Sequence, residues 1–201
     1  MKKAALLICA VLCFQIAAFG QTLSDEDRAK GVAYLEKTRQ GVIDATKGLS
    51  EAQWKFKAGP DRWSVAETLE HIALAEDFIF GNITEKVMMA PAGAPDRDFA
   101  KIDAGVLAMI PDRSHKAQAP PPLVPTGRWT PAETLDRFLK SREKTIAYMK
   151  STPDLRAHVV AENPLGMPLD GYEFLLFIAA HSERHTKQIL EVKADPNYPK
   201  K

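Results

Sequence analysis

Two histidines one helical turn apart, His181 and His185, are the residues in this chain best suited to chemistry. They belong to a seam with steps of three and four residues, made up of Phe174, Ile178, His181, His185, Gln188 and Val192. Such a seam faces the interior of a helical domain. Buried ring nitrogens need partners, because an unpaired buried polar group costs roughly 1–3 kcal/mol. The pair alone leaves two interpretations open: core histidines bonded to side chains or water, or two ligands of one metal ion.

His71 is the candidate for a third ligand. On a helical wheel it lies beside Leu74, Ala75 and Phe78, at the edge of the apolar face of its own predicted helix. Three protein ligands with an open fourth position are typical of catalytic zinc sites. An all-nitrogen ligand set favours Zn or Ni, with Fe or Cu as alternatives, over Mg or Ca.

Four long amphipathic helices are predicted to position these histidines. Ser24, Ser64 and Thr130 are expected N-caps, and Glu67 completes a capping box with Ser64. Pro131 suits the first position of a helix. The predicted helices cover residues 24–47, 64–89, 130–150 and 170–193. No segment alternates long enough to predict a sheet.

Long connections separate the predicted helices. Residues 49–63 form a connector that contains two tryptophans, and residues 151–169 form a linker with three prolines. The Pro-rich insertion, about 90–129, has room for one short helix, at 99–110. Four long helices with two lengthy crossovers predict an all-α fold, a four-helix bundle.

The N-terminus has the pattern of a secretory signal peptide. Lys2 and Lys3 precede an apolar stretch from Ala4 to Phe19, which is short for a membrane span of ~20 residues. Cleavage is expected before Gln21, with an uncleaved anchor as the alternative. The predicted organisation is therefore a signal peptide at 1–20 and a single domain at 21–201, in a secreted or periplasmic protein.

Cleavage would change both the charge and the cysteine content. Cys9 and Cys13 lie in the removed segment, so the mature chain would hold neither a disulfide nor a thiolate metal site. It would keep 25 basic and 26 acidic residues, a net charge of −1. This balance gives no reason to expect nucleic acid or an anionic membrane as a partner, and a small molecule is the expected ligand.

Two motifs resemble a known family. The segment from Trp63 to Ile72 is similar to the Trp-Ser-x-x-Glu-x-Leu-x-His signature of the DinB-like superfamily, and His181-x-x-x-His185 is similar to the pair in its last helix. The resemblance covers roughly 24–192, although the Pro-rich insertion is longer than usual. It implies a four-helix bundle in which His71, His181 and His185 bind a divalent metal ion, and related bundles often form homodimers.

The resemblance does not fix a reaction. Characterised members include transferases and isomerases that use low-molecular-weight thiols, which a secreted protein would rarely meet in reduced form. Hydrolysis or group transfer on a small molecule is the expected reaction class. Because no general base is evident beside the three histidines, a non-catalytic binding bundle and a purely structural bundle are the alternatives.

Other polar residues near the motifs receive simpler interpretations. Glu183 lies ~200° from His181 on the wheel and is expected to point away from it. Glu67 could orient His71, but its capping role is favoured. Gln188 could bind a ligand or be a hydrogen-bonded core residue. Tyr172, Glu173 and Arg184 are expected at the surface or its boundary.

Overall fold

The structure, a computed structural model, describes residues 22–200 apart from residue 164. The predicted signal peptide, 1–20, lies outside these described residues. The long helices are α1 (Asp25–Thr46), α3 (Val65–Glu85), α5 (Pro131–Ser151) and α6 (Gly171–Lys193). The short elements are α2 (Glu51–Lys55), η1 (Val87–Met89), α4 (Phe99–Met109), η2 (Pro121–Leu123), β1 (Val159–Val160) and β2 (Leu169–Asp170).

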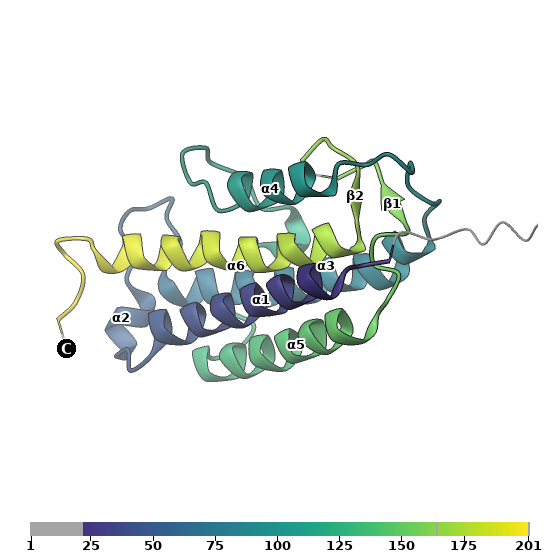
Figure 1. The fold of residues 1–201 in the computed structure, drawn as a ribbon. Coiled ribbons are helices and arrows are strands. Elements are labelled where there is room, and N and C mark those ends of the chain that lie inside the picture. Colours follow the sequence, from purple (N-terminus) through teal and green to yellow (C-terminus); the bar gives the residue numbers. More distant parts are fainter. Residues whose placement is uncertain (1–21, 164, 201) are drawn as a thin grey trace, which may run out of the picture.

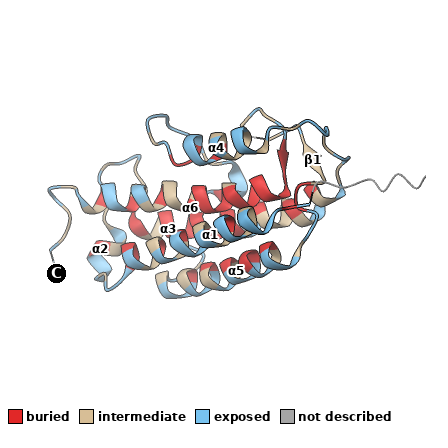
Figure 2. Cartoon of the chain, in the orientation of Figure 1, coloured by how far each residue is buried: buried red, intermediate tan, exposed pale blue. Residues whose placement is uncertain are grey.

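The four long helices form the predicted four-helix bundle (Figure 1). Both α1 and α3 pack mainly against α5 and α6. Helices α1 and α3 therefore lie across the bundle from each other, and so do α5 and α6. Helix α4 packs against α6 on the outside of the bundle. Figure 2 shows buried residues along the inner faces of the long helices, with exposed residues on the outer faces.

Side-chain caps fix where the long helices begin, as the sequence predicts. The Ser24 hydroxyl accepts a hydrogen bond from the Asp27 amide at 3.0 Å, and both Ser64 and Thr130 form capping boxes. A further capping box at α6, between Asp170 and Glu173, is not foreseen from the sequence. Each cap satisfies amide groups that the first helical turn leaves without a partner.

The short elements of the connections differ from the prediction. The connector at 49–63 contains α2, which begins with a Ser50–Gln53 capping box. The second helix ends at Glu85, and the 3-10 helix η1 follows it as far as Met89. Pro91 disfavours helical backbone at Ala90, which is extended, so the helical run stops there. The linker at 151–169 carries β1, which pairs with β2 in an antiparallel ladder of two residues each. Strands this short have no alternation from which to predict them.

A buried ion pair joins the four long helices in the core. Arg142 of α5 and Glu76 of α3 are 0% and 1% exposed, and their closest N–O distance is 2.7 Å. The same guanidinium donates to the Leu35 carbonyl of α1 and to the Ser182 hydroxyl of α6, each at 2.8 Å. One side chain therefore fixes the relative positions of all four helices around the bundle axis.

Candidate metal centre

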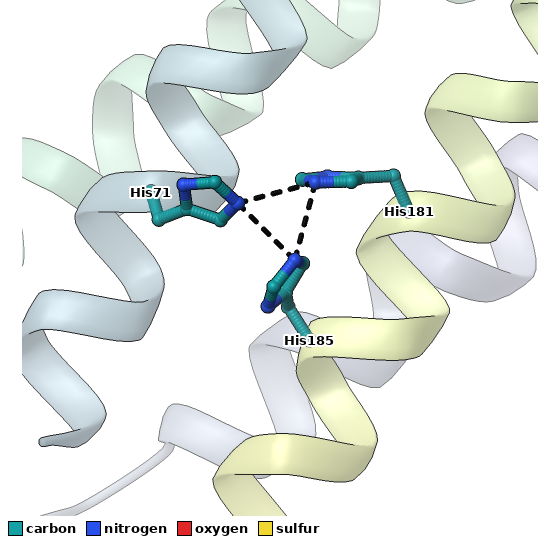
Figure 3. A group of neighbouring side chains, drawn as sticks. All are labelled: His71, His181 and His185. Atoms are coloured by element: carbon teal, nitrogen blue, oxygen red, sulfur yellow. Dashed lines mark hydrogen bonds between the residues drawn. The ribbon is translucent and has the colours of Figure 1, made fainter. Parts of the chain in front are cut away.

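The structure brings the three sequence-predicted histidines together. His71 comes from α3, and His181 and His185 come from successive turns of α6 (Figure 3). Their Nε2 atoms lie 3.2 Å apart for His71 and His181, 3.1 Å for His71 and His185, and 3.1 Å for His181 and His185. We call these three residues the histidine cluster. It forms because α3 packs directly against α6.

Hydrogen bonds on the outer ring nitrogens orient two members of the histidine cluster. Nδ1 of His71 donates to the Leu123 carbonyl at 2.8 Å, and Nδ1 of His185 donates to Oε1 of Gln188 at 2.9 Å. A carbonyl oxygen only accepts, so Nδ1 must carry the proton in both rings. In a neutral ring Nε2 then has a free lone pair, and both lone pairs point to the centre of the cluster.

Burial keeps these rings neutral. It lowers the pKa of His71, and it lowers the pKa of His185 to about 3. Burial also lowers the pKa of His181 well below its ordinary value, and the two neighbouring imidazoles lower it further. Neutral imidazole is the form that binds metal ions.

The histidine cluster fits a divalent transition metal ion. Nitrogen atoms bound ~2.0–2.1 Å from one tetrahedral ion lie roughly 3.3 Å apart, close to the observed 3.1–3.2 Å. Three lone pairs that converge on one point repel one another. Because His71 and His185 carry their protons on Nδ1, only a proton on Nε2 of His181 could reduce this repulsion. A cation would satisfy all three nitrogens together.

Aromatic rings border the histidine cluster. The Trp63 ring lies 4.8 Å from the ring of His71 and 6.5 Å from that of His185, between centroids. Phe177 stacks on His181 at 6.3 Å with an interplanar angle of 11°. Trp63, the first residue of the family-like motif, therefore lies against the cluster. The two rings give the cluster an apolar border.

The Pro-rich insertion contributes groups that sequence reasoning missed. Besides the Leu123 carbonyl, it supplies Arg113, which donates to Oε1 of Gln188 at 3.2 Å. Arg184, expected at the surface or its boundary, is partly buried and donates to three carbonyl groups of the insertion, those of Ile110, Asp112 and His115. The one sequence signal was Gln188, which is half-buried and accepts hydrogen bonds from His185 and Arg113.

The carboxylates of Glu67 and Glu183 bond to groups outside the histidine cluster. Glu67 accepts from the Ser64 amide at 2.8 Å and pairs with Lys57, so its favoured capping role is confirmed. Glu183 accepts from the Tyr34 hydroxyl and pairs with Lys187, pointing away as predicted. In the described part of the chain, the imidazoles bond to a carbonyl and an amide and lie against one another, and none bonds to a carboxylate.

Two further sites are separate from the histidine cluster. A cavity of about 620 Å³ lies between α1, α4 and α6 and has none of the three histidines in its lining. At the start of α6, Tyr172 and Glu173 are 2% and 0% exposed, so the prediction of surface or boundary positions is wrong for both. Glu173 pairs there with Arg97 at 2.6 Å, which explains how a charged residue can be buried.

Comparisons with known proteins match most of the chain. The family model of the DinB superfamily matches residues 34–189. The uncharacterized protein YuaE of Bacillus subtilis (strain 168) is 27% identical over 163 residues, which are 81% of this chain and 96% of YuaE. Both matched regions exceed half of the chain.

A solved structure has the same fold. YfiT from Bacillus subtilis, described as a probable metal-dependent hydrolase with an unusual four-helix bundle topology, aligns with a TM-score of 0.56 and 15% sequence identity. The alignment covers 89% of this chain and 93% of YfiT. At this identity the likeness concerns the fold.

Proposed function

This chain belongs to the DinB superfamily, and from that premise we propose that it is a metal-dependent enzyme whose ion is held by His71, His181 and His185. The observation that carries the proposal is the convergence of three Nε2 atoms at 3.1–3.2 Å. Zn or Ni is the proposed ion, with Fe or Cu as alternatives, because all three donors are imidazole nitrogens.

Each part of the site would have a separate task. A bound ion would act as a Lewis acid and lower the pKa of a bound water toward ~7. The Leu123 carbonyl and Gln188 hold the proton on Nδ1 of His71 and His185, which keeps each Nε2 free to bind. Trp63 and Phe177 exclude water and offer apolar surface to a small substrate.

Hydrolysis or group transfer on a small molecule is the proposed reaction. Support comes from the ligand set, which leaves room for an exchangeable ligand, and from the fold shared with YfiT, itself described as a probable metal-dependent hydrolase. In the described part of the chain no carboxylate bonds to the imidazoles, so acid–base work would fall to bound water or to the substrate.

The same observation favours a second candidate, a non-catalytic bundle that binds a metal ion or small ligand. A panel of esters, amides and thiol adducts offered to the metal-loaded protein distinguishes the two. Turnover that disappears with the ion supports the enzyme, and metal binding without turnover of the panel supports the binding protein.

We also propose that the protein acts outside the cytoplasm, because of the signal-peptide pattern at 1–20. Among the helices in the described residues, none has the length and apolar character needed to cross a membrane. A homodimer and a small-molecule ligand remain the proposed partners.

Elemental analysis tests the proposed metal site first. Protein purified without a His-rich tag is expected to hold about one equivalent of a transition metal, and a His71→Ala/His181→Ala variant is expected to hold none. His158→Ala is the matched control, because this half-buried histidine bonds to the Ala90 carbonyl, outside the cluster. Equal metal in the double variant and wild type, or none in wild type after incubation with Zn or Ni, would contradict the proposal.

A further inference from the structure

Residues 110–128, which we call the strap, are held by side chains that neighbour the histidine cluster in sequence. Arg184, directly before His185, donates to carbonyl groups at the start of the strap. Glu70, directly before His71, binds its end. The two residues that hold the strap are therefore direct sequence neighbours of two residues of the cluster.

Glu70 holds the end of the strap through backbone amides. Its side chain is 4% exposed. The carboxylate accepts from the amides of Thr126 at 3.0 Å, Gly127 at 2.8 Å and Arg128 at 3.4 Å. Gly127 has φ of 72°, a left-handed conformation that allows these successive amides to face one carboxylate. A buried charge with several charge-assisted hydrogen bonds fixes the turn strongly.

The strap also contacts the histidine cluster and its partner Gln188. Leu123, three residues before Thr126, accepts from Nδ1 of His71 at 2.8 Å. Near its start, Arg113 donates to the Gln188 oxygen that also accepts from His185. The strap thus supplies the acceptor for Nδ1 of His71, and it contacts the acceptor for Nδ1 of His185. A shift of the 126–128 turn would move the carbonyl that sets the proton position on His71.

We infer that Glu70 is a positioning residue for the histidine cluster: by fixing residues 126–128 it holds the Leu123 carbonyl on His71. Its effect on metal affinity rests on the proposed function, whereas its effect on His71 does not. Groups that orient a metal ligand typically contribute 10- to 100-fold to metal affinity. Coupling between strap and ion would also be reciprocal, so that a bound ion would hold the strap in place.

Glu70→Gln tests this inference, since it keeps the side-chain shape but turns an NH₂ group toward backbone amides. We expect Zn affinity, measured against a chromogenic chelator, to fall about 10- to 100-fold. In the metal-free protein, long-range ¹⁵N–¹H spectra of wild type are expected to show His71 protonated on Nδ1, and those of the variant a mixture of tautomers. A loss of stability alone would leave this tautomer unchanged.

Two further variants keep the test decisive. Gly127→Ala strains the same turn without a new contact, because its Cβ would meet nothing within 4 Å; we expect a smaller loss of affinity in the same direction. Glu67→Gln, one turn earlier on α3, is the matched control, with wild-type affinity and tautomer expected. If Glu70→Gln does not fold, Gly127→Ala decides the question.

The outcomes separate this inference from the proposed function. Wild-type affinity and a single His71 tautomer in folded Glu70→Gln and Gly127→Ala would overturn the inference. If wild type binds neither Zn nor Ni, the proposed function fails, and the tautomer alone decides: a mixture in Glu70→Gln supports Glu70 as a positioning residue, and an unchanged tautomer overturns it.

Discussion

At the scale of single residues, the three histidines of the cluster could be predicted from the sequence, whereas the groups that orient their rings could not. His181 and His185 are visible because two polar rings occupy an otherwise mainly apolar seam, and His71 because it borders another. The Leu123 carbonyl is invisible in a sequence, since every residue has one, and it meets His71 across 52 positions. Residue types thus reveal the candidate ligands, whereas backbone groups that orient them become visible only in three dimensions.

The depressed pKa values predict how metal-free protein responds to acid. In the unfolded chain a histidine has a pKa near 6.5, and in the folded chain burial lowers that of His185 to about 3. Between these values the unfolded state binds more protons, so stability is lost as the pH falls below about 6.5. At pH 5 the loss from His185 alone is about 2 kcal/mol.

Urea unfolding with a chelator at pH 7 and pH 5 measures this effect. Wild type is expected to lose about 2 kcal/mol more than His185→Gln between the two pH values, because glutamine does not titrate. His71 and His181 contribute in the same direction in both proteins. An equal loss in wild type and variant would show that His185 is not kept neutral by the fold.

At the scale of elements, helix starts follow from sequence while bundle contacts do not. Caps such as Ser64 and Thr130 act over three residues, so they are readable locally. The strands β1 and β2 are two residues long and depend on pairing between segments. Arg142 belongs to a predicted helix, but only packing reveals that it bonds to α1, α3 and α6 together.

Removing the buried carboxylate should loosen the bundle strongly. Glu76→Ala leaves the Arg142 charge 0% exposed without its main partner, and breaking such a pair typically costs 3–5 kcal/mol, so we expect a loss of about that size. Urea unfolding at pH 7 measures it.

A double variant supplies the control for this prediction. Glu76→Leu/Arg142→Met removes both charges, so it should lose less stability than Glu76→Ala, although Leu35, Thr38 and Ser182 lose a donor. A double variant as unstable as the single one would mean that helix packing, and not the unpaired charge, explains the loss.

At the scale of the whole molecule, the sequence predicts an all-α bundle but not how the insertion covers it. The length and prolines of residues 90–129 indicate a long crossover. Its docking depends on single charged residues of other elements, Glu70 and Arg184, which look like ordinary surface residues in a sequence. Long-range bonds of this kind have no periodicity, so the structure is needed to find them.

The N-terminal pattern leads to a prediction about the whole chain that the described residues do not test. Expressed in full length in a Gram-negative host, the protein is expected in the periplasmic fraction with Gln21 as its first residue. Both cysteines, Cys9 and Cys13, would be lost, so iodoacetamide should leave the intact mass unchanged. A Leu6→Arg/Leu7→Arg variant, with its apolar segment interrupted, should stay in the cytoplasm and take up two alkyl groups. Full-length wild type in the cytoplasm would contradict export. Full-length wild type in the membrane fraction would instead support an uncleaved anchor, which would hold the histidine cluster at a membrane surface.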